Sequence, residues 1–65
     1  MGGHVIIRSQ IRSAAEDPLN NAAIPDPLRT TVNAILANAN SSWSHTDCYT
    51  LAFALALIAC DNPNS

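Results

Sequence analysis

The chain has 65 residues and a formal net charge of −2, and only 12% of its residues are charged. A chain this short makes one domain and buries only about 60% of the surface that its unfolded form exposes, so small domains often need a disulfide, a metal or a partner. The only cations, Arg8, Arg12 and Arg29, are too scattered for a nucleic-acid surface, and Arg8 and Arg12 are expected to lie solvated on one exposed helix face. So few charges favour a surface that is partly covered in a complex.

The N-terminal segment does not resemble a secretion signal. It has no basic stretch followed by an apolar run and a small-residue cleavage site. We therefore expect a cytoplasmic protein whose two cysteines, Cys48 and Cys60, are reduced.

The first predicted element is a helix over residues 5–16. Ile7, Ile11 and Ala15 recur at the spacing of one helix face. The β-branched run Val5–Ile7 would also suit a short strand, which leaves helix or strand open for residues 4–8. A helix is favoured because no second strand candidate is present to pair with this run.

A loop with a short turn is expected over residues 17–26, followed by a second helix over residues 27–40. Asp17 precedes the turn as a cap. Asp26 is expected to cap the helix, with Pro27 at the first helical position, where a missing N–H costs nothing. The apolar residues of this helix fall on one face: Leu28, Val32, Ile35, Leu36 and Ala39.

The third predicted helix covers residues 45–60 and includes an uncharged run of twelve residues, Tyr49–Cys60. Ser44 and Asp47 have the spacing of a capping box, and Pro63 cannot continue the helix. A membrane span would need about 20 apolar residues. Alternating large and small residues would also fit a strand, but alanine is depleted in strands and is the best helix former.

This helix is apolar nearly all round, so it should be buried nearly all round. At about 100° per residue, Leu51, Leu55 and Ile58 fall on one side, and Tyr49, Phe53, Leu57 and Cys60 fall nearly opposite. A strip of small residues separates them (Cys48, Ala52, Ala56 and Ala59), and the strip left for water carries Asp47, Ala54 and Asp61. Two further helices cannot enclose it, so a second copy of the chain is the simplest completion.

The predicted interface therefore lies on this helix and on the tryptophan before it. Trp43 has two interpretations: it either packs over the helix start and the groove between helices, or it is an exposed anchor for a partner. The candidate interface residues are Trp43, Cys48, Leu51, Ala52, Phe53, Leu55, Ala56, Leu57, Ile58 and Ala59.

No metal site or catalytic site is expected. His45 and Cys48 lie one turn apart, but Cys60 is roughly 18 Å from Cys48 on the same helix at about 1.5 Å per residue, too far for one zinc ion or one disulfide. In an antiparallel dimer, Cys48 and Cys60 of different chains would approach each other. Ser44, His45 and Asp47 match a catalytic triad in composition only, because neighbours in one helical turn point in different directions.

The sequence thus predicts an all-α, three-helix single domain over residues 1–65 that is completed by oligomerisation. The predicted function is a non-catalytic protein–protein interaction module without a cofactor, either a homo-oligomer, with a dimer favoured, or a small subunit of an assembly. The alternative is a small acidic inhibitor or adaptor, of the virus or plasmid type, that docks on a larger host protein. Neither nucleic acid nor a membrane is an expected partner.

Overall fold

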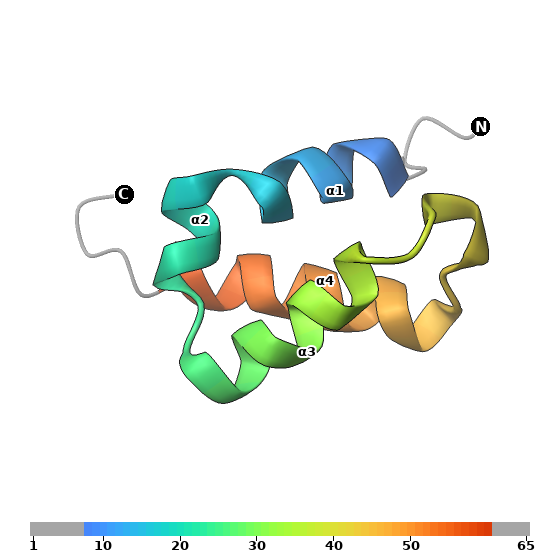
Figure 1. Ribbon diagram of the computed structural model, residues 1–65. Helices are drawn as coiled ribbons and strands as arrows, with labels where there is room; N and C mark the ends of the chain where they lie inside the picture. The colour runs from blue at the N-terminus through green and yellow to red at the C-terminus, as the bar shows by residue number, and fades with distance from the viewer. Residues whose placement is uncertain (1–7, 61–65) are drawn as a thin grey trace.

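The computed structural model describes residues 8–60, and this part of the chain is all-α, as predicted (Figure 1). It contains four α-helices and one short 3-10 helix. Their bounds are α1 Arg8–Glu16, α2 Pro18–Ala23, α3 Asp26–Leu36, η1 Asn40–Ser42 and α4 His45–Cys60.

The last helix is the centre of the arrangement. α4 contacts α1, α2 and α3, and α1 also contacts α3 and η1. In Figure 1, α1 crosses above α4, α3 lies across its front, and α2 joins the ends of α1 and α3. The three shorter helices therefore pack against α4 from one side.

One hydrophobic core lies between the helices. Each α-helix except α2 contributes residues to it, and the linkers before α3 and α4 contribute one residue each. The core residues are Ile11, Ala15, Ile24, Val32, Ile35, Trp43, Leu51 and Ala54. Five partly buried residues pack around them: Leu28, Leu36, Cys48, Leu55 and Ile58.

The predicted short turn is a six-residue helix, α2. Asp17 caps it as expected, since its carboxylate accepts hydrogen bonds from the backbone N–H groups of Leu19 and Asn20. Of the helix predicted over residues 5–16, the described part is helical from Arg8 to Glu16. Residues 4–7, where helix and strand were both open, lie outside the described residues.

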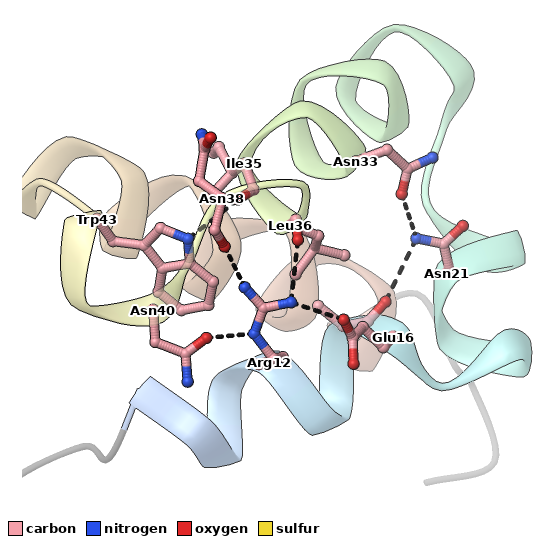
Figure 2. Close-up of polar contacts among 10 residues, drawn as sticks. Arg12, Glu16, Asn21, Asn33, Ile35, Leu36, Asn38, Asn40 and Trp43 are labelled. Carbon is pink, nitrogen blue, oxygen red and sulfur yellow. Dashed lines mark hydrogen bonds and ion pairs between the residues drawn. The ribbon is translucent and has the colours of Figure 1, made fainter.

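Two asparagines of α2 close the C-terminal end of α1. The Nδ2 of Asn20 donates to the carbonyl of Ala14 over 2.9 Å, and the Nδ2 of Asn21 donates to the carbonyl of Ala15 over 3.3 Å. Asn21 also donates to Oδ1 of Asn33 over 2.9 Å, which links α2 to α3 (Figure 2). Helix ends leave carbonyl groups without intrahelical partners, and these amides satisfy two of them.

Two predictions about α3 are wrong. Pro25, not Asp26, occupies the N-cap position, and no side chain caps this end. The carboxylate of Asp26 pairs instead with Arg29 inside the first turn. The helix ends at Leu36 rather than near Asn40, because Ala39 is extended and η1 follows. The carbonyls freed at this end accept hydrogen bonds from side chains far away in the sequence.

The last helix begins at His45 as predicted and is helical to Cys60, where the described residues end, and its capping box is confirmed. Ser44 N–H donates to Oδ2 of Asp47 and Asp47 N–H donates to Oγ of Ser44, both over 3.1 Å. The strip expected to face water is wrong at Ala54, which is only 1% exposed. A small residue at a helix contact allows close approach, and Ala54 lies in the core with Ala15 of α1. Asp61, from the same strip, lies outside the described residues.

Candidate protein interface

Arg12 connects α1 to the end of α3 and to the segment that precedes α4 (Figure 2). We refer to Arg12, Trp43 and the contacts that they make as the corner. The Nη1 of Arg12 donates to the carbonyl of Leu36 over 2.9 Å and pairs with Oε2 of Glu16 over 2.7 Å. Its remaining nitrogens donate to the carbonyl of Asn38 and to Oδ1 of Asn40. The expectation of two solvated arginines is therefore wrong for Arg12, whose cation sits at the C-terminal end of α3, where the helix dipole is negative.

Trp43 completes this corner from the other side. It is 3% exposed, and its Nε1 donates to the carbonyl of Ile35 over 3.0 Å. The guanidinium carbon of Arg12 lies 5.1 Å from the centroid of its ring, within the range of a cation–π contact. Trp43 thus packs over the groove between helices, and its interpretation as an exposed anchor is wrong.

The corner sets how α4 is rotated about its own axis. Trp43 is held by α3 and by Arg12 of α1, and the capping box of Ser44 and Asp47 begins α4 directly after it. The helix then presents Leu51 and Ala54 to the core. The opposite side of the helix is left facing outward.

The outward side of α4 is apolar. Tyr49 is 74% exposed, Phe53 is 59% exposed and Leu57 is 37% exposed. The spacing i, i+4, i+8 puts these three side chains in one row on the helix surface. Two exposed small residues, Ala56 and Cys60, lie beside the row. We refer to these five residues as the outer face of α4.

The structure separates the predicted interface residues into three groups. Trp43 and Leu51 belong to the core of the single chain, so they are not free to contact a partner. Four residues are half-buried: Cys48, Ala52, Leu55 and Ile58. The exposed members are Phe53, Ala56, Leu57 and Ala59.

Tyr49 and Leu19 were not among the predicted interface residues, yet they are the most exposed large apolar residues in the described part of the chain. The helical spacing of Tyr49 with Phe53 and Leu57 already carried that signal for Tyr49. No sequence signal marked Leu19, which is 84% exposed on α2. A first turn that begins with Pro18 gives no information about which side of so short a helix faces the core.

The chemistry available at this surface is limited to apolar contact. Between residues 48 and 60, α4 carries no charged side chain. Ser44 and Asp47 are used by the capping box, and His45 is exposed beside them. Within residues 8–60, no group of three or more His, Cys, Asp or Glu side chains could hold a metal ion.

One further property of the helices concerns membranes. Among the described residues, none of the helices combines the length and the apolar character that a membrane crossing requires.

Comparison with known proteins finds no family model, no curated protein and no solved structure that matches the chain.

Proposed function

We propose that this chain is a non-catalytic protein–protein interaction module that pairs with a second copy of itself through the outer face of α4. The observation that carries the proposal is the row of Tyr49, Phe53 and Leu57, three large apolar side chains exposed on one uncharged helix. Large apolar residues gathered on one face of a monomer mark interaction sites, whereas scattered ones need no explanation.

The size of the surface supports a partner of modest affinity. An aromatic side chain presents about 150–250 Å², so Tyr49 and Phe53 together expose roughly 250 Å². With Leu57, Ala56 and Cys60, the outer face reaches roughly 400 Å², within the roughly 300–600 Å² of the largest apolar patch on a typical monomer, which is often functional. Two such faces would bury roughly 800 Å² in total, which is below the roughly 1,200 Å² of stable specific interfaces, so we expect weak, transient pairing with a dissociation constant no tighter than micromolar.

The absence of charge on residues 48–60 favours a second copy over a charged partner. A charged partner would lose the hydration of its own groups against this surface and gain no ion pair in return. An identical uncharged helix has no such penalty. We place the module in the cytoplasm because its two free cysteines, Cys48 and Cys60, suit a reducing compartment.

The test is a comparison of Phe53→Glu with Leu19→Glu by light scattering after size exclusion, with a reducing agent present. Both side chains are exposed, so both variants should keep their helical circular dichroism. Wild-type chain and Leu19→Glu should give the mass of two chains at high concentration, while Phe53→Glu should give the mass of one.

Two results would overturn the proposal. One is a wild-type chain that stays monomeric up to roughly 1 mM, well above the expected micromolar constant. In that case the outer face would have to serve a different protein, as an adaptor or inhibitor would. The other is a Phe53→Glu variant that retains the dimeric mass.

A further inference from the structure

We draw no further inference here: the strongest candidate, the row of Tyr49, Phe53 and Leu57 on the outer face of α4, belongs to the interface already proposed, and nothing in the structure shows how a partner would lie against it.

Discussion

The two sides of α4 have similar composition and opposite surroundings. The side with Leu51 and Ala54 is closed off by α1, α2 and α3, while the side with Tyr49 and Phe53 is exposed. The larger side chains are on the exposed side, so hydrophobicity alone does not decide which side is buried. The difference follows from the number of helices: three short helices cover about half of the circumference of a fourth.

The comparison predicts a large loss of stability for one truncation on α4 and a small change for another. Leu51→Ala should lower the free energy of unfolding by about 2–5 kcal/mol, since it opens a cavity in the core. A domain of this length has only about 3–10 kcal/mol in total, so this loss is a large fraction of its stability. Phe53→Ala should change it by less than about 1 kcal/mol, because the ring is mostly exposed.

Urea titration followed by circular dichroism measures both variants. Equal destabilisation by the two truncations would show that the two sides of α4 contribute alike to the fold. The titrations belong at a concentration where the wild type is monomeric, because dimer formation would add to the apparent stability of the wild type.

A second prediction concerns the corner that sets the rotation of α4. Arg12→Ala removes the cation from the end of α3 and leaves the carbonyls of Leu36 and Asn38 without their side-chain donor. The expected loss is about 2 kcal/mol, since hydrogen bonds to charged groups contribute about 1.5–3 kcal/mol. The matched control is Arg8→Ala, which removes the same charge from an exposed position of the same helix.

The melting temperatures of Arg12→Ala and Arg8→Ala, measured by thermal unfolding, show how much each arginine contributes to stability. A control that lowers the melting temperature as much as Arg12→Ala would show that net charge, rather than the contacts of Arg12, is responsible. The variant Arg12→Lys sharpens this result further, because lysine keeps the charge but lacks the planar fork that reaches several acceptors at once.

The smallest expected effect concerns the exposed small residues of the outer face. Ala56→Leu enlarges an exposed side chain of the outer face, and it should disturb the proposed pairing and weaken the dimer about tenfold, or about 1.4 kcal/mol. Sedimentation equilibrium measures the dissociation constant of the dimer. Ala34→Leu makes the same change at an exposed position of α3 and should leave the constant unaltered. Tighter association of Ala56→Leu would mean that Ala56 is not closely packed in the contact.

Local features of the fold were predictable because their causes lie within a few residues. The capping box of Ser44 and Asp47 acts over three residues, and the cap of Asp17 acts over two or three. Both were recognisable from the spacing of residue types. The two apolar sides of α4 were also recognisable, because helical periodicity alone places Leu51 opposite Phe53.

Contacts over long separations were not predictable in this way. Arg12 and its acceptor on Asn40 are 28 residues apart, and no local pattern distinguishes this arginine from Arg8. The early end of α3 has the same origin. Its apolar spacing continues to Ala39, but the carbonyls near Leu36 are satisfied by distant side chains, so the helix can end there.

The sequence by itself determined that the described part of this protein is helical, where its last helix begins, and that this helix is too apolar for its neighbours to enclose. Only the tertiary structure decided which side of the helix is buried, since periodicity defines two sides but does not rank them. Packing determines which side is buried, because Leu51 and Ala54 fit between the other helices. The corner of Arg12 and Trp43 holds α4 in that rotation. The row of Tyr49, Phe53 and Leu57 is exposed as a consequence.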